Sequence, residues 1–217
     1  GPAGRVFGTS SLLGAINIVT KKEKTSNVSA HIDGGSYGYL SGGASLNLSS
    51  GKWTNRISGS YTRSDGYSRS KAGKLNGDFY GGKAFYQGGY EDSDIKVDWH
   101  AGLSSRDFGS NTFYGTGSDN QFEHTFKTYT AVQAETKRGK FHLKPSIYWN
   151  RNMDRFEWFR GHDGTKPEGL SYGVPYNYHR TDVYGVNLNS YFDWAFGRTA
   201  ISAELRNEDL VSTTLGE

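Results

Sequence analysis

In the segment Asp94-Ile95-Lys96-Val97-Asp98-Trp99-His100-Ala101-Gly102-Leu103, apolar and polar residues alternate at nearly every position. A period of two is typical of a β-strand with one apolar and one polar face. Similar segments recur along the chain, whereas no segment shows a convincing helical period. The sequence therefore predicts an all-β chain of roughly nine strands, with alternation clear in 141–150, 184–194 and 201–206, weaker in 28–32, 40–48 and 53–61, and strands without assigned faces in 77–90 and 121–136.

The predicted connections between strands come in two sizes. Short polar turns are expected at 49–52, 91–94, 137–140 and 196–198. Longer connections rich in Gly, Ser and Asp are expected near 65–76, 107–120 and 156–177, and the short hairpin 34–38 is the exception on that side. Because the two kinds alternate, all turns of an antiparallel meander gather at one end and all loops at the other. This asymmetry is typical of outer-membrane β-barrels.

Aromatic residues are expected near both ends of the strands, as in the two belts of a membrane barrel. The rings fall near the turns at Trp53, Tyr90, Phe141, Phe192 and Trp194, and near the loops at Tyr61, Tyr80, Phe122 and Tyr178. The polar face carries ionisable residues such as Lys96, Asp98 and Glu204, which suits a wet lumen. A soluble β-sandwich or a lipocalin-like barrel stays open as an alternative, because alternation does not show which face is inside.

Composition excludes several classes of protein. The 217 residues include no Cys, which removes disulfide scaffolds and thiolate chemistry. A net charge of +3 is too small to indicate a nucleic-acid binder. Six scattered histidines form no ligand pattern, Asp92-Ser93-Asp94 is expected to be a turn, and no nucleophile elbow is present. We therefore predict no enzyme activity, no metal site and no cofactor.

The first twenty-two residues carry a more specific pattern. Arg5, Gly8 and Gly14 precede Ala15-Ile16-Asn17-Ile18, and Thr20 and Lys21 follow. This segment resembles the closing stretch of the plug domain in TonB-dependent outer-membrane receptors, with mild departures at Phe7 and Ala15. The segments 34–38 and 61–67 look like that family's first hairpin and the end of its third strand. The resemblance is nearest to the cobalamin and siderophore receptor branch.

The resemblance implies an organisation and a function. Residues 1–22 would be the C-terminal end of the plug (with Arg5, Gly8, Gly14 and Asn17 as its structural motif), and 23–217 the N-terminal portion of a transmembrane barrel. Such receptors take up a large scarce nutrient, here cobalamin or a metal–siderophore chelate, across the bacterial outer membrane. The partners would be outer-membrane lipid, the nutrient and the TonB complex, which acts through an N-terminal segment not contained in this sequence. We therefore expect the chain to be a fragment that cannot close a barrel alone.

Two outer loops hold the candidate ligand contacts of this reading. Phe113 and Tyr114 lie in one expected loop, and Trp158 and Arg160 in another. Aromatic planes beside an arginine suit a large amphipathic or anionic ligand. The alternative is that these rings belong to the upper aromatic belt on a strand that continues above the membrane. Other functions that stay open are an oligosaccharide importer of the same fold, a passive porin and a soluble β-sheet binding module.

Overall fold

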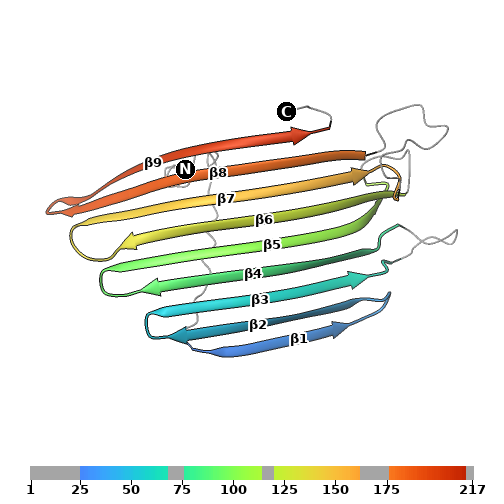
Figure 1. Cartoon of the computed structure of the whole chain (residues 1–217), viewed down its shortest axis with the longest axis horizontal. Coiled ribbons are helices and arrows are strands. Elements are labelled where there is room, and N and C mark those ends of the chain that lie inside the picture. Colours follow the sequence, from blue (N-terminus) through green and yellow to red (C-terminus); the bar gives the residue numbers. More distant parts are fainter. Residues whose placement is uncertain (1–24, 68–75, 114–119, 162–175, 214–217) are drawn as a thin grey trace.

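A computed structural model describes residues 25–67, 76–113, 120–161 and 176–213. These residues form one antiparallel sheet of nine strands, which follow each other in sequence order (Figure 1). The expected all-β meander of about nine strands is therefore confirmed. The strands are β1 (Asn27–Gly34), β2 (Leu40–Ser50), β3 (Trp53–Ser64), β4 (Phe79–Glu91), β5 (Ile95–Asn111), β6 (Gln121–Thr136), β7 (Phe141–Glu157), β8 (Tyr176–Trp194) and β9 (Gly197–Ser212).

Each strand pairs only with its neighbours in the sequence, and β1 and β9 form the two edges of the described sheet. The register is continuous across the sheet except for an irregularity between Gly109 and Asn111 in β5. None of the described segments is a helix of the length and apolarity that a membrane crossing requires.

Short turns and longer loops lie at opposite ends of the sheet, at the left and right of Figure 1. Gly51 takes a positive φ of 56° in the turn between β2 and β3, a backbone conformation that favours glycine. On the loop side, Tyr37 and Gly38 have φ values of 61° and 64° in the short connection between β1 and β2. This connection is tied to the next loop, because the Asp65 amide donates a 2.8 Å hydrogen bond to the Tyr37 carbonyl.

The later strands are longer than the expected ten residues. The strands β5 to β9 have 17, 16, 17, 19 and 16 residues. Residues 107–111 and 156–157, which we expected in loops, are the ends of β5 and β7. The extra residues carry ion pairs between strands, described below, so the sheet continues past its apolar band.

The register divides the side chains between two faces, since directly paired residues of an antiparallel sheet lie on the same side. Trp99 pairs with Gly88 and Val132, and Val186 pairs with Ile147. The alternating residues of the sequence thus form one continuous apolar face. It includes the rings expected near the turns, at Trp53, Tyr90, Phe141, Phe192 and Trp194, and it also takes in Tyr86 and Val132 from the two strands without assigned faces.

The apolar face is uncovered. Ile147 is 59% exposed and Val186 53%, although both lie in the interior of this face, and Leu205 on the edge strand β9 is 77% exposed. Among the described residues, Phe122 and Phe156 are the buried hydrophobic side chains, and both lie at the loop end. Nothing in the described part of the chain therefore packs on the apolar face as the second sheet of a sandwich would.

Candidate functional site

The polar face of the sheet has a floor of small residues in its first five strands. One row across these strands, traced by the register, runs Ser29, Ser45, Ser58, Phe85 and Gly102, and ends at Tyr129 of β6. Glycine at position 102 leaves room for the Tyr129 ring, because a Cβ there would displace the ring in its present position. The rings of Phe85 and Tyr129 therefore lie beside a strip of serine and glycine, whose small side chains leave space above the sheet.

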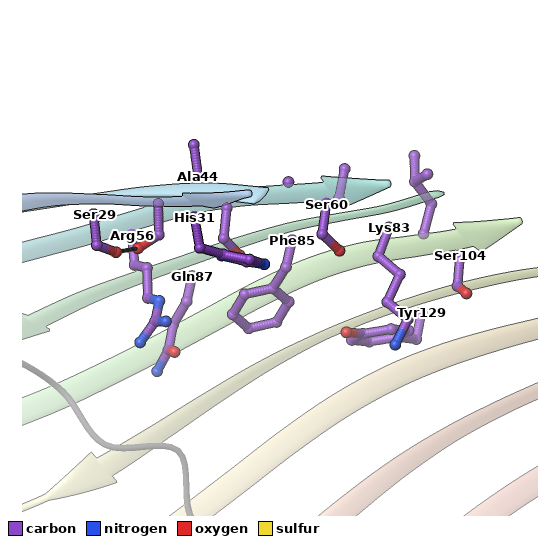
Figure 2. A pocket seen from close by; sticks show the side chains of 15 residues that line it. Ser29, His31, Ala44, Arg56, Ser60, Lys83, Phe85, Gln87, Ser104 and Tyr129 are labelled. Carbon is purple, nitrogen blue, oxygen red and sulfur yellow. Dashed lines mark hydrogen bonds between the residues drawn. The ribbon is translucent and has the colours of Figure 1, made fainter. Parts of the chain in front are cut away.

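A hollow of about 620 Å³ lies over this floor. Figure 2 shows Arg56 and Gln87 toward one end of it, Lys83 and Tyr129 toward the other, and Phe85 between them. His31 reaches over Gly43, where a Cβ would clash with its imidazole. The cationic side chains that line the hollow are therefore Arg56 and Lys83, His31 lies beside them, and no carboxylate is part of the lining.

Several other charges of the polar face have partners. Lys96 lies 3.8 Å from Asp98, Lys144 lies 3.3 Å from Glu135, and Arg206 pairs with Glu208. By contrast, neither Arg56 nor Lys83 has a carboxylate within ion-pair distance in the part of the chain that the structure describes. Only the register shows that Arg56 and Lys83 share one hollow.

A polar cluster ties the three longer loop connections together. The Arg160 guanidinium donates two hydrogen bonds to Asp78, of 2.5 and 2.8 Å, and one of 3.1 Å to Asn76. It also lies 4.5 Å from the centre of the Phe122 ring. The Asn76 amide donates in turn to the carbonyl of Gln121, which is fully buried. Charge-assisted bidentate pairs of this kind are strong and geometrically specific, so Arg160 fixes the loop ends relative to each other.

The predicted ligand-contact residues lie in two different settings. Phe113 is 83% exposed, whereas Trp158 packs edge-on against Phe156 with ring centres 5.1 Å apart. Arg160 belongs to the loop cluster, and Tyr114 lies outside the described residues. Ligand contact by these four residues stays a prediction. The predicted plug motif of Arg5, Gly8, Gly14 and Asn17 also lies outside the described residues. Phe122, expected as a ring of the upper belt, is covered by Arg160 and only 7% exposed.

On the side of the longer loops, the apolar face ends at a set of ion pairs. Asp182 accepts hydrogen bonds from Arg151 at 2.7 and 3.1 Å and from the Trp149 indole at 3.0 Å. Arg180 lies 3.4 Å from the same carboxylate, and His124 lies 2.7 Å from Asp107 two strands away. The apolar side chains on this face thus give way to paired charges, and the longer strands continue beyond that boundary.

The turn end has its own network around Asp92. This carboxylate accepts hydrogen bonds from the backbone amides of Asp94 and Ile95 at 2.8 and 2.9 Å and from the Tyr90 hydroxyl at 2.9 Å. These amide donors hold the pKa of Asp92 well below its usual range. Lys137 of the next turn donates to the Asp92 carbonyl at 2.9 Å. The turn predicted for Asp92-Ser93-Asp94 is confirmed, and the Asp92 side chain caps it.

In the described residues, no group of three or more His, Cys, Asp or Glu side chains is placed to hold a metal ion. No family model matches the sequence. No curated protein matches it either.

Solved structures do match the fold. One of them, described as the copper transporter OprC, superposes with a TM-score of 0.68 at 14% sequence identity. The match covers 88% of this chain and 30% of that chain, so this chain spans less than a third of the transporter's length. At this identity the similarity concerns the fold, and the protein it resembles is a transporter rather than an enzyme. The nine-stranded sheet described here is thus similar in fold to part of a known transporter.

Proposed function

We propose that the chain forms part of the membrane-spanning barrel of an outer-membrane transporter, with its apolar face toward lipid and its polar face toward a lumen. One observation carries the proposal: a continuous apolar face stays exposed on a single-layered sheet, and no described residue covers it. Exposing such a face to water is unfavourable, by roughly 25 cal/mol for each Å² of apolar surface. A bilayer is the solvent that removes this cost.

The dimensions of the face support this orientation. Phe192, near the turn, and Asp182, at the ion-paired boundary, are separated by ten residues of β8. At about 3.3 Å per residue and a tilt of about 40°, this distance corresponds to about 25 Å across the membrane, which matches the apolar band of outer-membrane barrels. Short turns at one end and longer loops at the other are typical of the same class.

The proposed cargo and energy source come from the sequence resemblance. On that resemblance the transporter is a TonB-dependent receptor of the bacterial outer membrane, and its cargo is cobalamin or a metal–siderophore chelate. Residues 1–22 would end its plug domain, and the TonB complex would supply the energy. The fold similarity to a copper transporter supports transport as the general function. It does not distinguish these cargoes.

Quenching of tryptophan fluorescence tests the orientation. By the register, Trp53, Trp99, Trp149 and Trp194 all lie on the apolar face. In the complete protein reconstituted into vesicles, we expect lipids brominated on their acyl chains to quench this fluorescence strongly and aqueous iodide to quench it weakly. Strong quenching by iodide together with weak quenching by bromine would show that the apolar face does not contact lipid, and would refute the proposal.

The ligand-contact prediction needs a separate test. In the complete receptor, replacing Trp158 by Ala removes a ring that is not part of the Arg160–Asp78 pair, so the loop ends keep their anchor. We expect weaker binding of the transported ligand, measured by titration of each candidate cargo. Phe141→Ala, at the turn end of β7, whose last residue Glu157 precedes Trp158, is the matched control. Equal affinity in the Trp158 variant and the control would remove this contact.

A further inference from the structure

We propose that the hollow on the polar face binds a small solute in which an oxyanion, phosphate or carboxylate, stands next to a flat ring. The hollow extends over β1 to β6, far from the loop residues considered above as ligand contacts. The hollow lies entirely on the polar face. Solute binding there would be a function in addition to transport and does not depend on the identity of the cargo.

The charge of the hollow selects an anion. Arg56 and Lys83 line it from adjacent strands, and no acidic side chain is part of its lining. Two lysines elsewhere on this face are paired with carboxylates, in the pairs Lys144–Glu135 and Lys96–Asp98. A guanidinium without a carboxylate in the described residues is a ready partner for an oxyanion, which it can bind through two parallel hydrogen bonds.

The shape of the hollow selects a flat group. Phe85 and Tyr129 stand with ring centres 6.3 Å apart and planes inclined by 34°, on either side of Gly102 in the register. Figure 2 shows the Phe85 ring between Arg56 and Lys83 on the same side of the sheet. Aromatic faces of this kind stack on planar ligand groups.

The floor supplies both space and hydrogen bonds. Ser58, Ser60 and Ser104 line the hollow, and their hydroxyls can donate to an oxyanion or accept from a ligand hydroxyl. A volume of about 620 Å³ falls within the range of small-molecule sites. The Ser29 hydroxyl is already paired with Ser45 at 2.7 Å, so that edge of the floor is fixed.

The binding test uses phenyl phosphate and benzoate as probes, with the complete protein in detergent micelles and saturation-transfer NMR or calorimetry as the measurement. We expect Arg56→Gln and Lys83→Gln each to weaken binding about tenfold, as loss of a charge-assisted hydrogen bond would. Benzyl alcohol, which has the ring without the anion, should bind more weakly than either probe. The ratio of the phenyl phosphate and benzoate affinities decides between a phosphate and a carboxylate solute.

Two further variants separate a built site from general attraction to a basic surface. Lys144→Gln removes a paired cation from the same face outside the hollow, and we expect it to leave probe binding unchanged. Ser58→Phe keeps every cation but fills the floor, and we expect it to abolish binding. Circular dichroism of each variant checks that the sheet is intact.

Two outcomes overturn the inference. One is unchanged binding of both probes by the Arg56 and Lys83 variants, or by the Ser58 variant. The other is the absence of binding in the unchanged protein, as when a carboxylate of the chain itself occupies the hollow. Either result leaves the lipid-quenching experiment unaffected, so failure of this site and failure of the transport proposal are distinguishable.

Discussion

Placing an arginine on the apolar face of β8 tests the orientation of the sheet quantitatively. Val186 lies on this face, six residues from Phe192 and four from Asp182, and therefore near the middle of the band between the turn-side rings and the ion-paired boundary. In a bilayer, an arginine near the midplane costs about 2–4 kcal/mol, and one near the interface costs about 0–1 kcal/mol. From its position we expect Val186→Arg to lower the free energy of unfolding by about 2–3 kcal/mol.

The adjacent residue is the matched control. Asn187 points to the polar face, where it pairs with Ser146 and Glu204. An arginine there meets water and a carboxylate, so we expect Asn187→Arg to change the free energy of unfolding by less than about 1 kcal/mol. Ser190→Arg adds a depth control, because Ser190 lies on the apolar face only two residues from Phe192 and should cost about 0–1 kcal/mol.

The assay is denaturant unfolding of the complete protein in phosphatidylcholine vesicles, followed by tryptophan fluorescence. The reasoning requires Val186→Arg to be clearly the most destabilising of the three, with Ser190→Arg and Asn187→Arg each costing about 1 kcal/mol or less. If Val186→Arg costs no more than Asn187→Arg, the apolar face does not lie in hydrocarbon. If Asn187→Arg is the more harmful change, the two faces are assigned the wrong way round.

Three further predictions concern the ends and the packing of the sheet. Gly102→Ala places a Cβ against the Tyr129 ring and should destabilise the protein by about 1–3 kcal/mol. In the control Gly82→Ala, the atom nearest to the new Cβ is 3.5 Å away, so the loss of stability should be smaller. Thermal unfolding compares the two variants, and equal effects would contradict the packing argument. Asp92→Asn should speed hydrogen exchange at the amides of Asp94 and Ile95. Because the pKa of Asp92 is depressed in the folded protein, the carboxylate stabilises the turn fully above the ordinary pKa of aspartate, and this stabilisation is lost only as the pH falls through the lower folded-state pKa. If the exchange rates of these two amides at neutral pH are the same with and without the substitution, Asp92 does not cap the turn. Arg160→Lys keeps the charge but loses the double hydrogen bond to Asp78, so we expect the free energy of unfolding to fall by about 1 kcal/mol and the loops to be cleaved faster by proteases. Arg138→Lys, in an exposed turn, is the control. Identical cleavage rates in the two variants would show that Arg160 does not anchor the loops.

The sequence predicted the strands best where one face is aliphatic or aromatic throughout. The alternation from Ile95 to Leu103 placed every residue on the correct face. The test is strict, because a register slip of one residue would move all of these side chains to the opposite face. The faces of β4 and β6 could not be assigned, because Phe85 and Tyr129 place rings on the polar side while Tyr86 and Val132 lie on the other. These rings are accommodated by serine and glycine on neighbouring strands, and such pairing is visible only once the register is known.

The loop cluster and the hollow could not be predicted for a different reason. Arg160 and Asp78 are 82 positions apart, and no local pattern indicates that they meet. Arg56 and Lys83 lie on different strands, and only the register brings them to one hollow. The boundary between apolar and ion-paired residues on β7 and β8 was also not predicted, because Arg151, Arg155 and Asp182 fall between the segments of clear alternation, 141–150 and 184–194, and the loop expected near 156–177.

The strictly sequential order of the strands affects how such a sheet can form and diversify. Every ladder joins neighbours along the chain, so each pairing closes only a short connection and the sheet can grow by adding one hairpin after another. Insertion of a single strand would exchange the positions of every later turn and loop, whereas insertion or deletion of two strands would preserve them. The hairpin is therefore the smallest unit by which this architecture can gain or lose width and still keep each connection on its own side.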